Sequence, residues 1–306
     1  MTEPMPVISV RDVHVDYPGH PPVHAVRGVS FDLFEGEVVG LVGESGCGKS
    51  TMARVLTGLV PRTEGEVEFL GESVEALGIG RRPVELTGIQ MVFQDPGSSL
   101  NPRRRVGSQI MDGLKLAAYR ERRRLAELED LLDDPDLPPL LTRTASRSLP
   151  DQPKTPAEWL ERVGLDAADA NRYPRSFSGG QRQRIATARA LAAQPQVLIG
   201  DEPISALDAS TQARVAYLMS TLAVSQGTAL LFISHDLSVV RLIADRLLVM
   251  WSGRIVESGP TEEVWSNPGH PYTKSLLAAI PAPDGAGRLP AMPESQADFD
   301  APPVIH

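Results

Sequence analysis

The sequence predicts an α/β fold built around a parallel β-sheet, and three observations lead to this prediction. A glycine-rich loop at residues 43–50 lies between an apolar, strand-like run and a segment with helical spacing. Two more apolar runs, at residues 197–200 and 229–233, alternate with helical patterning, and strands that alternate with helices pair in parallel. The chain has 306 residues, 42% of them hydrophobic, so it can bury a core of this kind.

The first half of the chain predicts strands followed by helices. Residues 7–42 contain short alternating or apolar runs broken by Pro and Gly, which is typical of strands. Helical spacing begins at Ser50, a further strand is expected at 89–93, and a helix is expected from 109–124 onward. Residues 120–134 carry charge on most faces beside a Leu stripe, so we expect a solvated amphipathic helix there rather than a binding surface.

The second half predicts a loop, two helices and an open tail. Residues 135–156 are rich in proline and polar residues, which indicates a loop or linker. Helical patterning returns at 157–163 and at 181–193. Residues 281–306 are rich in Pro, Ala and acidic residues and have little to bury, so we expect a flexible tail. The sequence contains no internal repeat, so it holds one unit of this fold.

Charge and cysteine content limit the function classes. The net charge of −9 argues against a broad nucleic-acid-binding surface, so no nucleic-acid partner is expected. The single cysteine excludes a disulfide framework and favours a reducing compartment. The segment MTEPMPVISVRD lacks the features of a secretory signal, and no apolar stretch approaches the roughly 18–20 residues that cross a bilayer. We therefore expect a cytosolic protein that partners would hold at a membrane.

Residues 43–50 match the phosphate-binding pattern G-x-x-x-x-G-K-[ST]. Its glycines let backbone N–H groups surround phosphate oxygens, and the following helix N-terminus adds partial positive charge. Lys49 would reach the β- and γ-phosphates, and Ser50 would supply a hydroxyl to Mg²⁺. The alternative is a chance glycine-rich turn. The loop residues predicted to bind nucleotide are Gly43, Glu44, Ser45, Gly46, Cys47, Gly48, Lys49, Ser50 and Thr51.

Cys47 in this loop precedes a helix, whose dipole lowers the pKa of a nearby thiol. We therefore expect a reactive thiol, whose alkylation inhibits the protein and is prevented by bound ATP. The segment VLIGDEP places Asp201 and Glu202 at the carboxyl end of a strand, where ligands bind in parallel sheets. Asp201 would hold Mg²⁺, and Glu202 would orient and polarise the attacking water. An acidic turn without a function is the alternative.

The segment SFSGGQRQR at residues 176–184 closely resembles the signature of the ATP-binding cassette (ABC) transporter family. The resemblance covers about residues 7–280. It includes a glutamine loop with Gln94, a D-loop with Asp208, and the histidine His235 in LFISHD. It implies a P-loop NTPase cassette with a RecA-like core, an antiparallel β subdomain and an inserted α-helical subdomain. The implied divisions are 1–95 for the β subdomain and first part of the core, 96–180 for the helical subdomain, 181–265 for the second part of the core, and 266–306 for a C-terminal extension.

The resemblance also implies roles for individual residues. Cassettes of this family pair head to tail, so each ATP lies between the phosphate loop of one chain and the signature of another. The implied signature residues are Ser178, Gly179, Gly180 and Gln181. His235 would contact the γ-phosphate, and Asp208 would link the two sites. Tyr17 would stack on adenine, although a core position is the alternative. The implied catalytic residues are Glu202 and His235, and the implied metal ligands are Ser50, Gln94 and Asp201.

The segment GHPYTKSLLAAIPAPD at residues 269–284 resembles the C-terminal extension of the oligopeptide and dipeptide uptake branch, as do FQDPGSSLNPR and NRYPRSFSGGQRQRIATARAL. This implies a second cassette subunit, identical or paralogous, two transmembrane permease subunits and an extracytoplasmic solute-binding protein, at the cytoplasmic face of the membrane. Nickel or glycan import, peptide export and a soluble, non-transport ABC ATPase are the alternatives. Relatives with an iron–sulfur site carry cysteines after this extension, and here none follows, so no cluster is expected.

Overall fold

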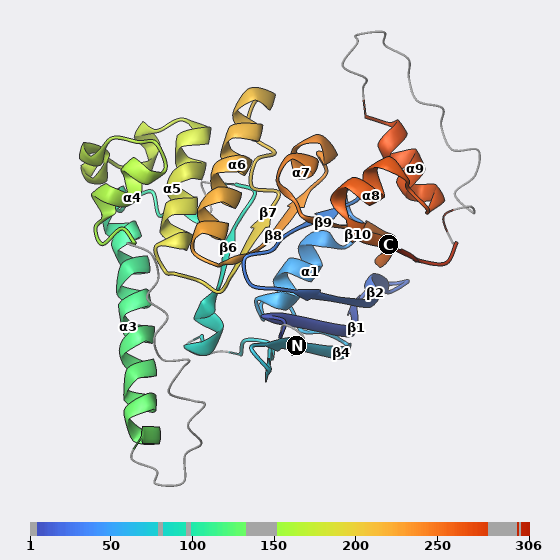
Figure 1. The fold of residues 1–306 in the computed structure, drawn as a ribbon, viewed down its shortest axis with the longest axis horizontal. Helices are drawn as coiled ribbons and strands as arrows, with labels where there is room; N and C mark the ends of the chain where they lie inside the picture. The colour runs from blue at the N-terminus through green and yellow to red at the C-terminus, as the bar shows by residue number, and fades with distance from the viewer. Residues whose placement is uncertain (1–4, 79–81, 96–98, 133–151, 281–298, 300) are drawn as a thin grey trace.

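The computed structural model of the chain is drawn in Figure 1. It describes residues 5–78, 82–95, 99–132, 152–280, 299 and 301–306. Most of the predicted loop at 135–156 and of the predicted tail at 281–306 therefore lies outside the described residues.

A parallel sheet forms the centre of the described fold. Its strand order is β11-β10-β9-β3-β8-β7-β6. The strands from β9 to β6 pair in parallel, and β10 joins β9 in antiparallel orientation. The bounds are Val38–Val42 for β3, Ile89–Val92 for β6, Val197–Asp201 for β7, Ala229–Ser234 for β8, Arg246–Trp251 for β9, Arg254–Pro260 for β10 and Val304–Ile305 for β11. The predicted α/β fold with a parallel sheet is confirmed.

Both faces of this sheet are covered, because every residue of β3, β7 and β8 is buried. Successive side chains of a strand point to opposite faces. Val38 and Val42 accordingly belong to one hydrophobic core, while Val39 and Leu41 belong to the other. Helices α5, α6 and α7 cover the first face, and α1 and a second sheet cover the other (Figure 1).

The second sheet is antiparallel, with the order β2-β1-β4-β5. Its strands alternate buried and exposed positions, as expected for a sheet with one face on a core. Its strands are β1 (Ile8–Tyr17), β2 (Val23–Leu33), β4 (Glu64–Phe69) and β5 (Glu72–Ser73). The strands predicted within residues 7–42 are thus present, and they divide between the two sheets.

Most helices begin at a side chain that accepts a backbone hydrogen bond. Thr155, Ser178, Asp208 and Asp236 each cap a helix in this way. The helices are α1 (Lys49–Leu56), α3 (Val106–Leu132), α4 (Pro156–Arg162), α5 (Gly179–Leu191), α6 (Ala209–Ser225), α7 (Leu237–Ile243), α8 (Thr261–Ser266) and α9 (Pro271–Ala278), with 3₁₀ turns at Glu85–Gly88, Ala167–Asn171 and Pro174–Ser176. Residues 121–126 of α3 are exposed, as predicted for a solvated helix.

The end of the chain differs from its prediction. Val304 and Ile305 form β11 beside β10, and the His306 N–H donates to the Ser258 carbonyl at 2.9 Å. Phe299 is buried against Trp251 and Tyr272. The expectation of little to bury does not hold for Phe299, whereas residues 301–306 are half-buried or exposed. The flexibility of the tail stays a prediction. Composition averaged over the whole tail conceals this single buried aromatic residue and the short strand β11.

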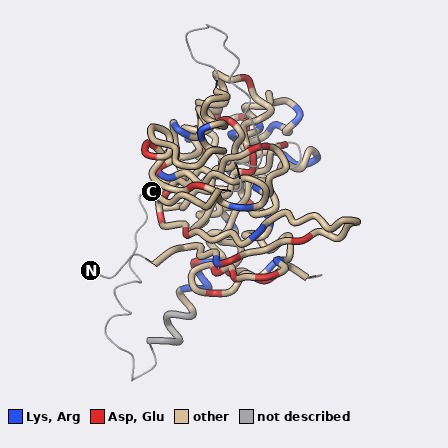
Figure 2. Tube along the Cα trace, turned by 90° about the vertical axis from the view of Figure 1, so that its right-hand side faces the viewer, with Lys and Arg blue, Asp and Glu red and all other residues tan. Residues whose placement is uncertain are grey.

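Charged residues of both signs are interspersed along the described chain (Figure 2). Several form ion pairs within the chain, among them Arg104 with Asp112 and Arg241 with Glu262. Within the described residues, no helix has both the length and the apolar character required to cross a bilayer.

Candidate functional site

The glycine-rich loop joins β3 to α1 at the carboxyl end of the central sheet. Gly43 and Gly48 have positive φ angles of 151° and 111°. A Cβ atom at Gly43 would lie 2.1 Å from the Met250 carbonyl oxygen, and one at Gly48 would lie 2.2 Å from the Ala25 carbonyl oxygen. Only glycine fits these positions, because both the backbone conformation and the neighbouring strands exclude a side chain.

Lys49 is folded back into the concave side of this loop. Its side chain is buried, and Nζ donates to the carbonyl oxygens of Gly43 at 2.8 Å and of Glu44 at 2.7 Å. A buried ammonium group needs hydrogen-bond acceptors, and the loop carbonyls supply them. The structure thus places one positive charge inside the loop, as the motif predicts.

Ser50 and Asp201 meet across the end of the sheet. The Ser50 hydroxyl, in the first turn of α1, donates to Asp201 Oδ1 at 2.7 Å. Asp201 ends β7 and is buried, and this burial raises the pKa of its carboxyl group, while the Ser50 hydrogen bond opposes the rise. A hydroxyl and a carboxylate side by side are the oxygen ligands that a hard divalent cation prefers.

Glu202, the next residue, faces two other predicted site residues. Its Oε2 lies 3.3 Å from His235 Nδ1, and Gln94 Nε2 donates to the same oxygen at 3.4 Å. The Glu202 side chain is only 15% exposed, whereas that of His235 is 52% exposed. The ends of β6, β7 and β8 therefore bring together a shielded carboxylate, an open imidazole and an amide.

The backbone of Glu202 is unusual. Its φ angle is 47°, in the left-handed region that a non-glycine residue seldom adopts. Its N–H donates to the Ile233 carbonyl oxygen at 3.0 Å, which fixes the turn after β7. Such a conformation costs about 1–3 kcal/mol and persists where the surroundings determine it, most often at functional sites.

These residues border a cavity of about 400 Å³. It is lined by Val23, His24, Ala25, Ser45, Gly46, Cys47, Gly48, Lys49, Ser50, Thr51, Gln94, Glu202, Ser252 and Gly253. Sequence reasoning did not identify the lining residues from β2 and from the turn after β9. Gly253 is tied to the loop, because its N–H donates to the Cys47 carbonyl at 3.0 Å. No local motif marks these positions, since only strand pairing brings them to the loop.

Tyr17 lies at the edge of the loop. It is half-buried, and its hydroxyl is 3.5 Å from Thr51 Oγ1, so it contacts the first turn of α1. It also packs against the hydrophobic core beneath the loop, and the cavity lining given above does not include it. Its stacking on adenine stays a prediction.

The prediction that the helix N-terminus lowers the pKa of the Cys47 thiol was wrong. The thiol is buried, and burial raises its pKa even though Lys49 Nζ lies 3.7 Å from its Sγ. The side chain packs in the hydrophobic core under the loop, although Cys47 also borders the cavity. That bound ATP protects Cys47 from alkylation stays a prediction. A lowered thiol pKa no longer supports it.

The signature residues lie at the start of α5. Ser178 accepts the Gln181 N–H at 3.3 Å, and the Gln181 side chain accepts the Ser178 N–H at 3.0 Å, forming a reciprocal cap. Ser178 is exposed. Among the described residues that line the cavity beside the phosphate loop, none comes from 178–181. The loop and the signature of one chain thus do not share a cavity.

Asp208 caps the next helix, α6. It accepts the Ser210 hydroxyl at 2.7 Å and the Thr211 N–H at 3.0 Å, and these hydrogen bonds lower the pKa of Asp208 to about 2. Its carboxylate therefore has a structural partner within the chain.

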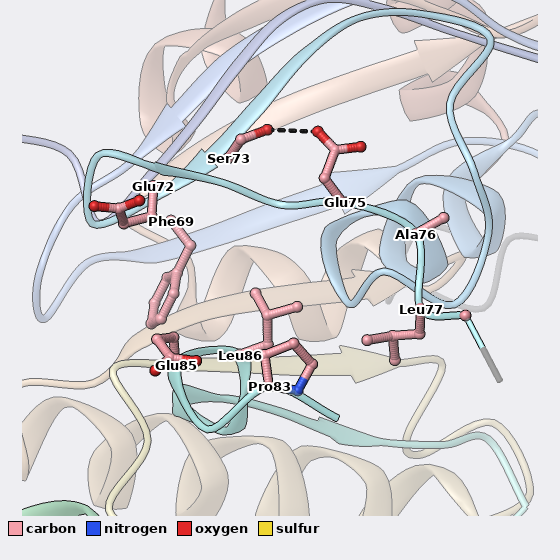
Figure 3. Close-up of a pocket in the computed structure, with 10 residues that line it drawn as sticks. Phe69, Glu72, Ser73, Glu75, Ala76, Leu77, Pro83, Glu85 and Leu86 are labelled. Carbon is pink, nitrogen blue, oxygen red and sulfur yellow. Dashed lines mark hydrogen bonds between the residues drawn. The ribbon is translucent and has the colours of Figure 1, made fainter. Parts of the chain in front are cut away.

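A larger cavity of about 540 Å³ lies away from the loop, between the β4–β5 hairpin and the Glu85–Gly88 turn (Figure 3). Phe69 and Leu86 line it. The Ser73 hydroxyl donates to Glu75 at 2.8 Å, and this bond lowers the pKa of Glu75. None of the sequence-predicted site residues lines this cavity among its described residues. Many of the residues predicted to bind nucleotide, among them Lys49 and Ser50, line instead the smaller cavity beside the phosphate loop.

Comparison with known families identifies the family of the chain. Residues 26–205, more than half of the chain, match the family model of the ABC transporter. The chain belongs to the ABC transporter family. It is an ATP-binding and ATP-hydrolysing cassette, which confirms the predicted ATPase. Residues 256–304 match a second model, the C-terminal region of oligopeptide/dipeptide transporters.

Several relatives are similar over most of the chain. The oligopeptide transport ATP-binding protein OppF of Bacillus subtilis is 47% identical over 265 residues, which is 86% of this chain and 78% of that protein. The di/tripeptide transport ATP-binding protein DppF of Pseudomonas aeruginosa is 41% identical, over 98% of this chain and 86% of that protein. The glutathione import ATP-binding protein GsiA of Salmonella typhi is 44% identical, but this chain covers only 39% of it.

Solved structures show the same fold. The cassette MJ0796, solved as a dimer in a post-hydrolysis state bound to ADP and Pi, has a TM-score of 0.61 at 26% identity, covering 83% of this chain and 98% of that one. The cassette MJ1267 in its ADP conformation has a TM-score of 0.63 at 26% identity, covering 86% and 96%.

Proposed function

We propose that this chain is the subunit whose ATP hydrolysis powers the import of di- or oligopeptides through a membrane. The observation that carries this proposal is the match of residues 256–304 to the C-terminal region of oligopeptide/dipeptide transporters. The names of the relatives OppF and DppF support the same substrate class.

In the proposed site, Lys49 and the loop N–H groups hold the phosphates of ATP. The Lys49 ammonium here donates two hydrogen bonds to loop carbonyls, at 2.8 Å and 2.7 Å. When phosphate oxygens enter the loop, these bonds turn to the stronger, charged acceptors. Thr51, one residue after Ser50, adds a contact to the α-phosphate, and Tyr17 stacks on the adenine.

Ser50, Asp201 and Gln94 would hold Mg²⁺. The 2.7 Å contact between the Ser50 hydroxyl and the Asp201 carboxylate supports this set, because the two oxygens already converge at a buried edge. Bound Mg²⁺ would neutralise charge on the β- and γ-phosphates. Gln94 would supply its amide oxygen from an exposed loop, and its position beside Glu202 would let it sense the closed site.

Glu202 would act as the base that orients and polarises the attacking water. Support comes from its low exposure and from the two groups, Gln94 and His235, that fix its Oε2. The exposed His235 would reach the γ-phosphate and keep Glu202 aimed at the water.

The site would be completed by a second cassette, identical or paralogous. The helix start at Ser178, Gly179, Gly180 and Gln181 would offer a hydroxyl, N–H groups and a helix dipole to the γ-phosphate bound by the partner. Asp208 would link the two sites. Two transmembrane permease subunits would anchor the pair at the cytoplasmic face of the membrane, and an extracytoplasmic solute-binding protein would deliver the peptide.

The experiment is transport by the reconstituted complex. The chain is co-purified with the membrane subunits encoded beside it, placed in vesicles, and supplied with labelled di- and oligopeptides, glutathione, Ni²⁺ or glycans. ATP-dependent peptide uptake that disappears in Glu202→Gln is expected. Uptake of Ni²⁺ or a glycan alone, or peptide movement only in the export direction, would contradict peptide import.

A further inference from the structure

The C-terminal helix α9 touches the phosphate loop through one side chain. The Tyr272 hydroxyl accepts the backbone N–H of Glu44 at 3.0 Å, and Tyr272 is fully buried. Burial raises the pKa of its hydroxyl, so it stays a neutral phenol at physiological pH. Tyr272 does not line the cavity beside the loop, so it acts on the backbone of the loop from behind.

The hydrogen bond from Glu44 to Tyr272 involves a peptide group that also contacts Lys49. The N–H of Glu44 and the C=O of Gly43 belong to one peptide unit, and the Gly43 carbonyl accepts Lys49 Nζ at 2.8 Å. Tyr272 therefore holds one side of this unit and Lys49 holds the other. Gly43 can adopt backbone conformations that are unfavourable for residues with a Cβ atom. This peptide can therefore rotate unless both sides are fixed. When Lys49 turns to phosphate, Tyr272 is the contact that keeps the peptide oriented.

The Tyr272 ring is itself held by the end of the chain. Its centroid lies 5.3 Å from that of Phe299 at an interplanar angle of 77°, and 6.0 Å from that of Trp251. The Phe299 and Trp251 rings are 5.6 Å apart, also edge to face. These are favourable aromatic geometries, and all three rings belong to one hydrophobic core.

A polar network fixes the same region. Glu257 of β10 is fully buried and accepts the N–H groups of Gly269 at 2.7 Å and His270 at 3.0 Å, and it lies 2.6 Å from Nε2 of His306. His270 caps α9 by accepting the Tyr272 N–H, and its Nε2 lies 3.2 Å from the Ala301 carbonyl oxygen. The start of α9 is thus connected to the last residues of the chain.

We propose that Tyr272 is a positioning residue for the phosphate loop, and that residues 299 and 301–306, here called the C-terminal clasp, hold it in place. Ordering of the clasp then sets the affinity of the loop for ATP. This inference concerns ATP binding by the cassette and is independent of which substrate is transported.

The first test is Tyr272→Phe in the full chain, which keeps the ring and removes the hydroxyl. The loss of one hydrogen bond predicts a rise of about 2- to 12-fold in the KM for ATP and in the Kd for a fluorescent ATP analogue, with kcat unchanged. A partly unfolded preparation would instead lower kcat at constant KM, because only the active fraction falls. Tyr217→Phe, on an exposed tyrosine of α6, is the matched control and should leave both constants unchanged.

The second test removes the clasp. Phe299→Ala, and a chain that ends at residue 298, should raise KM and Kd in the same direction as Tyr272→Phe. Combining Tyr272→Phe with the shortened chain should raise KM and Kd little beyond the rise from either change alone, because both changes release the same peptide group. An unchanged KM in Tyr272→Phe would overturn the positioning role, and an unchanged KM in a folded shortened chain would overturn the role of the clasp.

Discussion

The phosphate loop and the signature are both helix starts, but they differ in what surrounds them. Around Lys49 and Ser50, the ends of several strands supply a carboxylate, an imidazole, an amide and a lined cavity within one chain. Around Ser178, the side-chain oxygens serve a cap at the exposed start of α5. The difference shows that the predicted loop, carboxylate and histidine residues gather within one chain, whereas Ser178 is exposed away from them.

The largest effect on ATP binding is expected from Lys49→Ala. The side chain supplies the only ammonium group that lines the cavity among its described residues, and hydrogen bonds to charged groups contribute about 1.5–3 kcal/mol each. We expect ATP affinity of the isolated chain to fall by roughly 100-fold or more. Titration with a fluorescent ATP analogue measures this, with Lys115→Ala on the exposed part of α3 as the control. Tight binding by Lys49→Ala would show that the cavity is not the phosphate site.

Glu202→Gln should separate binding from chemistry. The amide keeps the shape of the side chain but cannot take a proton, so turnover should fall by about 10²- to 10⁴-fold while ATP binding is kept. The Glu202→Gln variant loaded with ATP should then accumulate as a closed dimer, which light scattering detects. Glu121→Gln, on an exposed residue of α3, is the control. Near-normal phosphate release by Glu202→Gln would contradict the assignment of Glu202 as the base.

Ser178→Ala should have the smallest effect on an isolated chain. It removes the cap of α5, and loss of an N-cap lowers the free energy of unfolding by about 0.5–2 kcal/mol. ATP binding by the isolated chain should stay unchanged, since none of the described residues lining its cavity belongs to 178–181. Denaturant unfolding and analogue titration measure the two quantities. Weaker ATP binding at unchanged stability would mean that loop and signature act within one chain.

The predictable parts of the molecule are those with local patterns. The loop motif identified Lys49 and Ser50, and apolar strands ending in polar residues identified Asp201 and Glu202, because strand ends of a parallel sheet share one edge. Family resemblance added His235 and Gln94, which the structure brings to Glu202.

The parts that could not be predicted depend on contacts between distant segments. Tyr272 reaches Glu44 across 228 residues, and no pattern in either segment signals the contact. The helix start suggested a lowered pKa for Cys47, but the direction of its side chain into the core decides the outcome. The tail composition predicted little to bury, whereas the ring of Phe299 is buried against Trp251 and Tyr272.

The central claim is that each chain holds only half of an ATP site, its phosphate loop, and that the signature of another chain supplies the other half. The most direct test of this half-site is ATP hydrolysis by a tandem of two linked copies. One copy carries Lys49→Ala and the other carries Ser178→Arg, and a tandem of two unaltered copies gives the reference rate. If each ATP lies between two chains, both defects fall in one composite site and the other site is intact. The mixed tandem should then keep about half of the reference activity, while a tandem with either change in both copies is inactive. A mixed tandem as inactive as the doubly altered ones would place loop and signature in the same chain and contradict the half-site.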